Sequence, residues 1–317
     1  MLRWFEFSRA RIMEMDADQF SSDELLTKAC WIDAQEPEEE ERLQLEQLLR
    51  TELPESDEVE EIEASARYFV DAAGIHVHSL FLTQTEGRQK TATVAFILQA
   101  NRLITVRDEE LADFRLFRMR ARRMPVEEES HQSVMISLFE QKVEHLADAL
   151  EDIHTDLEEV SHLVLEDNDA DLEDAIDKLA KLEDSNGKIR LCLMDTQRSI
   201  SFLQRHLRQY PELQQRCWEI MHDVETLMSH TSFLFDKINF LMDSTQGFIN
   251  IEQNQIIKTF SIAAVVFLPP TMIASIYGMN FEFMPELKWF LGYPWALGLM
   301  ILSGIAPYWY FKRKGWL

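Results

Sequence analysis

The sequence predicts an α+β membrane protein with a water-soluble N-terminal part and two C-terminal transmembrane helices. Three observations lead to this fold class. Strand-like and helical patterns alternate before residue 125, purely helical periodicity follows, and two long apolar runs lie near the C-terminus. The chain has 317 residues and a formal net charge of −25, which allows a soluble part with its own hydrophobic core.

The first part of the chain has the pattern of a mixed α/β domain. Six runs rich in β-branched and aromatic residues are predicted strands: Trp4–Phe7, Ala29–Asp33, Ala66–Val70, Ile75–Leu82, Thr91–Leu98 and Leu103–Arg107. The last two are joined through Gln-Ala-Asn, which suits a hairpin turn. Helices are expected after the capping box Ser21 to Glu24, after Pro37, and from Asp108 to about Arg123.

From about Ser130 the periodicity becomes purely helical. Apolar residues keep one side of this helix free of charge: Leu138, Leu146, Leu150, Ile153, Leu157, Val160 and Val164. A second acidic helix is expected from about Ala170 to Gln209. The two helices predict a long hairpin broken at Glu166–Asp169, and Tyr210-Pro211 ends the second helix.

A third helix follows, and the sequence contains no stop signal for it before Gly278. At 1.5 Å per residue this helix is about 100 Å long. No charged residue occurs from Thr259 to Phe281, which is enough to span a bilayer, and a second apolar run covers Phe290–Phe311. The basic run Lys312–Lys314 then predicts that both termini are cytoplasmic.

These patterns predict a definite order of segments. They are a cytoplasmic α/β domain (1–129), an acidic helical hairpin (130–210), a cytoplasmic stalk helix (211–258), a first transmembrane helix (259–277), a periplasmic loop (278–289), a second transmembrane helix (290–311) and a basic cytoplasmic tail (312–317). One continuous helix that passes from water into lipid implies a stalk that couples the soluble domain to the membrane.

Composition excludes several classes of function. The acidic surplus argues against nucleic acid, because phosphate binding needs clusters of Lys and Arg. The chain has no GxxxxGK[ST] motif, so ATP is not expected as a partner. The three cysteines are widely spaced, which indicates a reducing compartment rather than a disulfide framework. We expect no enzymatic activity and no resident cofactor.

The most specific motif is Tyr277-Gly278-Met279-Asn280, at the end of the first apolar run. Alone, it could be a glycine helix end followed by a turn. The loop continues with Met284-Pro285-Glu286-Leu287 before the second run. Together these features resemble the CorA family of magnesium transporters along the whole chain. The stretches Glu61–Arg67 and Tyr310–Lys314 are similar to enterobacterial-type members.

The resemblance implies a homopentameric funnel in the bacterial inner membrane, with the first transmembrane helix lining its axis. It implies uptake of Mg²⁺, with Co²⁺ and Ni²⁺ also expected to pass, under control of Mg²⁺ bound in the cytoplasm. The expected partners are further copies of the chain, membrane lipid and divalent cations. Two alternatives stay open: a Zn²⁺ transporter of the same superfamily, and a membrane-anchored metal sensor that does not conduct.

The chemistry of the motif fits such a pore. A helix that ends at Gly278 presents free carbonyls and about half a negative charge at its end. Gly278, Met279 and Asn280 are the predicted mouth. Asn280 is the predicted metal contact, acting through the waters of hydrated Mg²⁺, which that ion gives up reluctantly. A ring of carboxylates would hold the ion more tightly and slow its release.

Counting back from Asn280 at helical spacing gives a candidate pore stripe. Its members are Asn254, Ile257, Phe260, Ala264, Leu268, Thr271 and Ser275. The stripe could also be a packing face, since small residues are favoured between helices in lipid. The polar Asn254 and Thr271 favour pore lining, and the apolar members would be constrictions that gate by dewetting. Pro269-Pro270 frees backbone carbonyls, which by hypothesis also face the pore.

Three features of the soluble part carry weaker hypotheses. Dense carboxylates near residues 55–63 and 166–174 could hold regulatory Mg²⁺, although a solvated face is the default interpretation. His76 and His78 share one strand face, where buried or surface histidines are more common than a metal pair. The basic helix with arginines at 115, 118, 120, 122 and 123 is expected to bind neighbouring acidic segments.

Overall fold

The computed structural model describes residues 1–16, 20, 22–49, 67–85, 87–125, 129–166, 171–280, 282 and 284–316. The chain forms two compact units, Met1–Met242 and Asp243–Leu317. The acidic stretch 55–63 and the hairpin break at Asp167, Asn168 and Asp169 lie outside the described residues.

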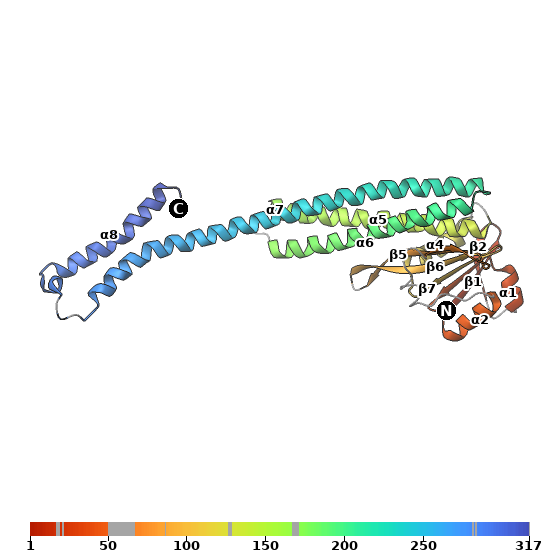
Figure 1. Cartoon of the computed structure of the whole chain (residues 1–317), viewed down its shortest axis with the longest axis horizontal. Coiled ribbons are helices and arrows are strands. Elements are labelled where there is room, and N and C mark those ends of the chain that lie inside the picture. The colour runs from red at the N-terminus through yellow and green to blue at the C-terminus, as the bar shows by residue number, and fades with distance from the viewer. Residues whose placement is uncertain are drawn as a thin grey trace. The chain divides into compact units, whose positions relative to one another are not determined.

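The first unit is built on one seven-stranded sheet (Figure 1). Its strands are β1 (Leu2–Ser8), β2 (Arg11–Met15), β3 (Trp31–Gln35), β4 (Tyr68–Val70), β5 (Ile75–Thr85), β6 (Arg88–Leu98) and β7 (Leu103–Arg107). Their order in the sheet is β2-β1-β3-β7-β6-β5-β4, and only the β3–β7 pair is parallel. The six predicted strands are confirmed, as is the hairpin from β6 to β7.

Strand β2 was missed because its turn has no sequence signal. Arg9 and Ala10 join β1 to β2 with φ of 51° and 59°, as a tight hairpin turn requires. Such turns are usually read from Asn-Gly or Asp-Gly, which tolerate positive φ at low cost. A β-strand at the sheet edge with only two buried residues then gives little further pattern.

Helices cover both faces of the sheet (Figure 1). One face packs on α1 (Ser22–Lys28) and α2 (Glu39–Leu49), which contribute Leu25 and Leu45 to a small core. The other face packs on α4 (Ala112–Arg123), whose Phe114 is fully buried, and on α5 and α6. The sheet is therefore a middle layer, as expected for an α/β domain.

The helical part follows the predicted pattern. Helix α5 (His131–Glu166) and helix α6 (Leu172–His206) pack as a hairpin, and the seven apolar residues predicted for one side of α5 are all buried. Helix α7 begins at Pro211, where a missing N–H costs nothing, and runs to Tyr277. Within the first unit it is tied to α6 by a hydrogen bond from the Asn186 amide to the Thr231 carbonyl, at 3.0 Å.

The basic helix α4 binds acidic neighbours, as predicted. Arg118 pairs with Asp33 at 3.2 Å and with Glu110 at 3.0 Å, and Arg120 pairs with Glu144. Asp33 is fully buried and also accepts Nη2 of Arg107 at 3.0 Å. These arginines therefore hold α4 to the sheet and to α5 rather than forming an open cationic surface.

The second unit contains the rest of α7, a 3₁₀ turn η2 (Pro285–Lys288) and α8 (Gly292–Arg313). Among the described helices, α7 is the one with the length and hydropathy of a membrane span. Only 6% of its most apolar window is buried. Helix α8 is 22 residues long and covers residues 292–311 of the second apolar run. Its Trp, Tyr, Gly and Pro residues lower its mean hydropathy, so the same criterion does not select it.

Candidate pore helix and its mouth

The predicted mouth lies where α7 ends. The Gly278 N–H donates to the Ala274 carbonyl at 2.9 Å, and the Met279 N–H donates to the Ile276 carbonyl at 3.3 Å. The helix therefore closes with a final turn, and Gly278, Met279 and Asn280 are all exposed beyond it. Phe281, next in the chain, lies outside the described residues.

Gly278 does not adopt a left-handed turn at this helix end. Its φ is not positive, unlike that of Gly74, Gly87 and Gly315, so the simple glycine-cap interpretation does not apply. A Cβ at Gly278 would lie 3.2 Å from the Ala274 carbonyl oxygen, tighter than ordinary contact. A larger residue would therefore displace the backbone that carries Met279 and Asn280.

The loop after the mouth also depends on a glycine. Gly292 donates its N–H to the Trp289 carbonyl at 3.1 Å. A Cβ at Gly292 would lie 2.3 Å from the Glu286 carbonyl oxygen, a distance that no side chain can adopt. The MPEL segment thus folds tightly back on the start of α8.

All seven members of the candidate pore stripe are exposed on α7. At about 100° per residue, six of them lie within about 40° of Ala264, while Asn254 lies about 80° away, at the edge of the stripe. The largest of the apolar members are among the most exposed: Ile257 62%, Phe260 72% and Leu268 65%. A soluble protein would bury such a row, so it needs lipid or further subunits to cover it.

The opposite side of α7 faces α8. Ile262 is 8% exposed, and Val266 and Ile273 are half-buried; these three lie about 160–180° around the helix from Ala264. A Cβ at Gly304 of α8 would lie 3.4 Å from Cγ of Pro270 and 3.6 Å from the Val266 carbonyl oxygen. Helix α8 therefore leaves the predicted stripe uncovered.

The double proline also departs from expectation. Pro269 and Pro270 lie inside a continuous helix and have no N–H to offer the carbonyls of Val265 and Val266. The Val266 carbonyl oxygen lies toward Gly304, on the side of α7 away from the predicted stripe, and the hypothesis that the freed carbonyls face the pore stays a prediction. The Thr271 hydroxyl donates to the Phe267 carbonyl at 2.7 Å. The Thr271 hydroxyl is thus paired within its own helix, whereas the Val265 and Val266 carbonyls receive no helix N–H.

The soluble unit holds no metal cluster among its described residues: no group of three or more His, Cys, Asp or Glu side chains converges there. His76 and His78 are both buried, as the more common interpretation predicted. Nε2 of His76 lies 3.0 Å from a carboxylate oxygen of Asp71. Burial lowers the pKa of His78 to about 4, so this ring is neutral at physiological pH.

The comparisons with known proteins support one family. The model of the CorA-like Mg²⁺ transporter protein family matches residues 27–313. The chain belongs to this family. The magnesium transport proteins CorA of Salmonella typhimurium and Escherichia coli K12 are each 48% identical to it over 319 residues, covering 100% of both chains. The family is one of transporters, not enzymes.

Solved structures of CorA-like proteins show the same fold. The complete CorA magnesium transporter of Methanocaldococcus jannaschii has a TM-score of 0.76 at 18% identity, covering 100% of this chain and 99% of the other. The full-length CmaX protein has a TM-score of 0.73 at 17% identity, covering 99% and 97%. The cytoplasmic ZntB domain of Vibrio parahaemolyticus, at 12% identity, covers 78% of this chain and 97% of the other with a TM-score of 0.57.

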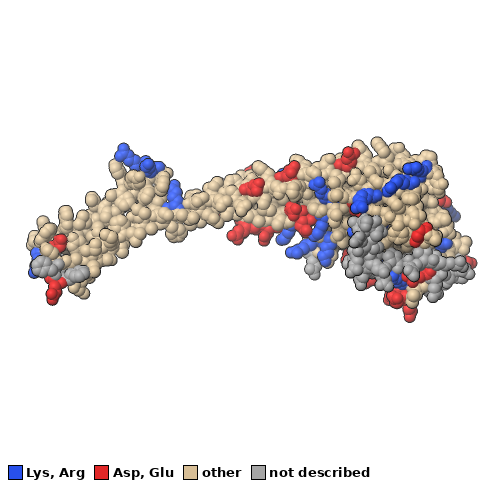
Figure 2. All heavy atoms as spheres, viewed as in Figure 1, with Lys and Arg blue, Asp and Glu red and all other residues tan. Residues whose placement is uncertain are grey.

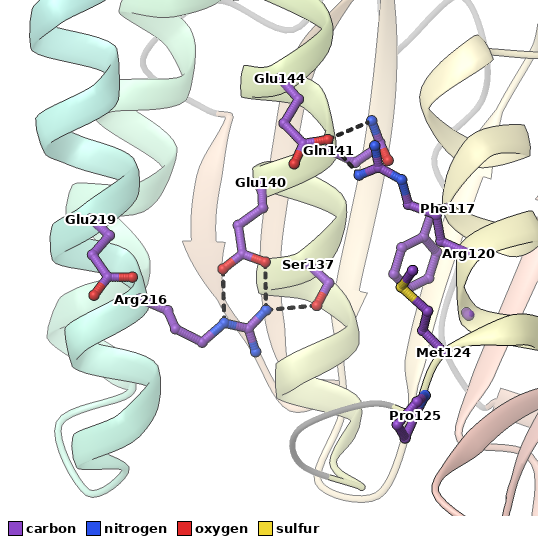
Figure 3. Close-up of a pocket in the computed structure, with 11 residues that line it drawn as sticks. Phe117, Arg120, Met124, Pro125, Ser137, Glu140, Gln141, Glu144, Arg216 and Glu219 are labelled. Carbon is purple, nitrogen blue, oxygen red and sulfur yellow. Dashed lines mark hydrogen bonds and ion pairs between the residues drawn. The ribbon is translucent and has the colours of Figure 1, made fainter.

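The CorA-like soluble unit also has a polar pocket of about 300 Å³ between α4, α5 and α7 (Figure 3). Figure 3 shows Arg216 of α7 facing Glu140 of α5, with Ser137 beside them. Arg216 makes two hydrogen bonds to the Glu140 carboxylate, at 2.8 and 2.6 Å, and one to Ser137 at 2.6 Å. Its charge is therefore already paired, and the pocket joins α7 to α5 rather than offering a free anion site.

Gly304 of α8 is a contact residue of the candidate pore helix that sequence analysis did not single out. It lies where α8 meets Pro270, and a Cβ there would be in ordinary van der Waals contact with the proline ring. The signal available was a glycine within an apolar run of the same length as the first one. Periodicity alone does not say which glycine of α8 meets the double proline.

Proposed function

We propose that the protein is a Mg²⁺ uptake channel of the bacterial inner membrane that assembles as a homopentamer. The observation that carries the proposal is the full-length 48% identity to two proteins named for magnesium transport. The exposed stripe on α7, which ends in Gly278-Met279-Asn280, supplies the path. One such stripe cannot enclose a path, so several copies must surround it.

In this proposal both apolar runs span the bilayer, and both termini are cytoplasmic. Hydrated Mg²⁺ meets the ring of Asn280 amide oxygens and helix-end carbonyls at the outer mouth, which hydrogen-bond to its waters. The ion then passes Thr271 and the apolar constrictions of the stripe. Inward movement needs no ATP, because a divalent cation gains about 4.6 kcal/mol per 100 mV of inward-negative potential.

Closure is proposed to follow Mg²⁺ binding between the acidic soluble units of neighbouring subunits. Facing carboxylates repel one another, and a divalent cation between them removes that cost. Loss of the cation would loosen the ring and move the α7 stalks. Removal of residues 1–242 should leave a pore that internal Mg²⁺ no longer shuts; a truncated pore that still closes at the same Mg²⁺ concentration would contradict this part of the proposal.

The function is tested by ion flux into liposomes that contain the purified protein. Mg²⁺ entry driven by an inward-negative potential is expected, with Co²⁺ and Ni²⁺ also entering. Competition among Mg²⁺, Co²⁺ and Zn²⁺ separates this function from Zn²⁺ transport, since excess Zn²⁺ should not displace Mg²⁺ from a Mg²⁺ channel. A protein that binds metal but gives no flux would instead be the non-conducting sensor.

A further inference from the structure

The second unit contains an apolar cavity of about 590 Å³ at the end of the membrane segment that carries the basic tail. Residues of α7 and of the C-terminal tail line it: Asn254, Ile257, Lys258, Ser261, Ile262, Val265, Phe311 and Trp316. This volume lies within the range of about 300–1,000 Å³ that small-molecule sites occupy. Lys258 is the last charged residue before the apolar run, so the cavity crosses the boundary between water and hydrocarbon.

The tail is folded to form one wall of this cavity. Gly315 has a φ of +70°, which ends α8 and turns the chain back. The Trp316 N–H donates to the Phe311 carbonyl at 3.1 Å, and the two rings stack with centroids 5.6 Å apart. Trp316 nevertheless stays 53% exposed. A tryptophan held open beside an apolar cavity at an interface is suited to contact a lipid chain and headgroup.

The positive charge around the cavity favours an anionic occupant. Lys258 lines it, and Lys312, Arg313 and Lys314 lie in the same tail, within a chain whose net charge is −25. Figure 2 shows basic side chains gathered at the C-terminal end of α8, while the rest of the visible surface of α8 carries little charge. Among the described residues, no acidic side chain pairs with Lys258, Lys312 or Lys314.

The cavity borders the predicted pore stripe, with which it shares Asn254 and Ile257, and extends from there toward the α8 side. Lys258 and Val265 lie about 100–120° around α7 from Ala264, on the flank between the stripe and the α8 side. A molecule held at Lys258, Val265 and Trp316 would occupy this flank of α7, beside Asn254 and Ile257 of the stripe. It would contact both transmembrane helices at the level where α7 leaves the membrane.

We propose that this cavity binds an anionic phospholipid of the cytoplasmic leaflet, with an acyl chain against Ile262, Val265 and Trp316 and the phosphate beside Lys258. The proposal rests on the two-span arrangement of the proposed function. Anionic headgroups of that leaflet attract basic residues at its surface, and basic pockets between membrane helices are suited to such lipids. The lipid would tie the basic tail to α7.

The test counts lipids bound to the full-length oligomer by native mass spectrometry, in a mild detergent after removal of native lipid. Phosphatidylglycerol and phosphatidylcholine with the same acyl chains are the probes. The wild type should hold phosphatidylglycerol more tightly. Lys258→Gln should weaken that binding roughly fivefold, the factor that one lysine near an anionic surface contributes. Lys288→Gln, in η2 at the other end of the unit, is the matched control and should change nothing.

Val265→Trp fills the cavity and should reduce binding of phosphatidylglycerol in the same spectra, with the oligomer intact. Equal binding of the two lipids, or equal effects of Lys258→Gln and Lys288→Gln, would overturn the proposal. So would a Val265→Trp protein that loses its oligomer while Lys258→Gln binds lipid normally, because a neighbouring chain would then occupy the cavity. Lipid binding is measured without ion flux. A negative binding result therefore says nothing against Mg²⁺ transport, and an absence of flux says nothing against lipid binding.

Discussion

Lys142 and Asp195 form a buried ion pair that should dominate the stability of the soluble unit. Nζ of Lys142 lies 3.6 Å from a carboxylate oxygen of Asp195, and both side chains are at most 5% exposed. The same ammonium donates to the Ser79 hydroxyl at 2.9 Å. Burial lowers the pKa of Lys142, and the negative charge of Asp195 opposes that shift. The pair links strand β5 to both helices of the α5–α6 hairpin.

Asp195 has further hydrogen-bond donors nearby, so substitutions of the two partners should lower the free energy of unfolding by different amounts. Asp195→Asn leaves the ammonium buried without its counter-charge, which costs about 3–5 kcal/mol. Lys142→Met should cost only about 1–3 kcal/mol, because Asp195 still accepts hydrogen bonds from the Ser79 hydroxyl at 2.6 Å and the Leu80 N–H at 2.8 Å. A methionine also keeps contact with the Phe81 ring, over which Nζ lies at 4.7 Å.

The double variant is the decisive case. With both charges removed, the buried ammonium is gone and only the partly exposed Arg67, 3.5 Å from Asp195, lacks its carboxylate, so Lys142→Met in the Asp195→Asn background should restore about 1–2 kcal/mol of stability. Chemical unfolding of the full-length protein in detergent, followed by circular dichroism, measures all four proteins. If the double variant is as unstable as the sum of the two single changes, the pair is not an electrostatic unit and the reasoning fails.

Three further predictions follow from the structure. His78 is protonated below about pH 6.5 in the unfolded chain but only near pH 4 in the folded chain. The wild type should therefore lose up to about 3 kcal/mol of stability as pH falls through that window. His78→Leu should remove most of this loss, as measured by melting curves at about pH 4.5 and 7.5. Arg216→Met removes the bonds to the partly exposed Glu140 and should lower the free energy of unfolding by about 1–2 kcal/mol in the same assay. No change would mean that this pair does not tie α7 to α5. Gly278→Ala places a Cβ 3.2 Å from the Ala274 carbonyl and should cut Mg²⁺ flux at normal expression, whereas wild-type flux would show that the mouth tolerates the shift.

Local patterns predicted most of the fold. The apolar side of α5 is predicted correctly because one-sided burial imposes a helical period on it, and Leu103–Arg107 because a short run with β-branched residues suits a strand that is buried throughout. Strand β2 was not, because Arg9 and Ala10 adopt positive φ without the residues that usually announce it. Helical spacing likewise places the residues of the candidate pore stripe on one exposed side of α7, and their pore-lining role stays a prediction. It could not give the contact between Gly304 and Pro270, or the direction of the Val266 carbonyl, because both depend on where a second helix packs.

The central claim is that Mg²⁺ passes through a pore whose outer mouth is formed by Asn280. It is tested most directly by potential-driven Mg²⁺ entry into liposomes that contain wild-type protein or Asn280→Ala, at matched protein content and oligomeric state. Gln255→Ala, at an exposed position of α7 about 180° around the helix from Ala264 and far from the mouth, is the control. The account predicts flux in the wild type and the control and a loss of most of it in Asn280→Ala. Equal flux in all three proteins would contradict it.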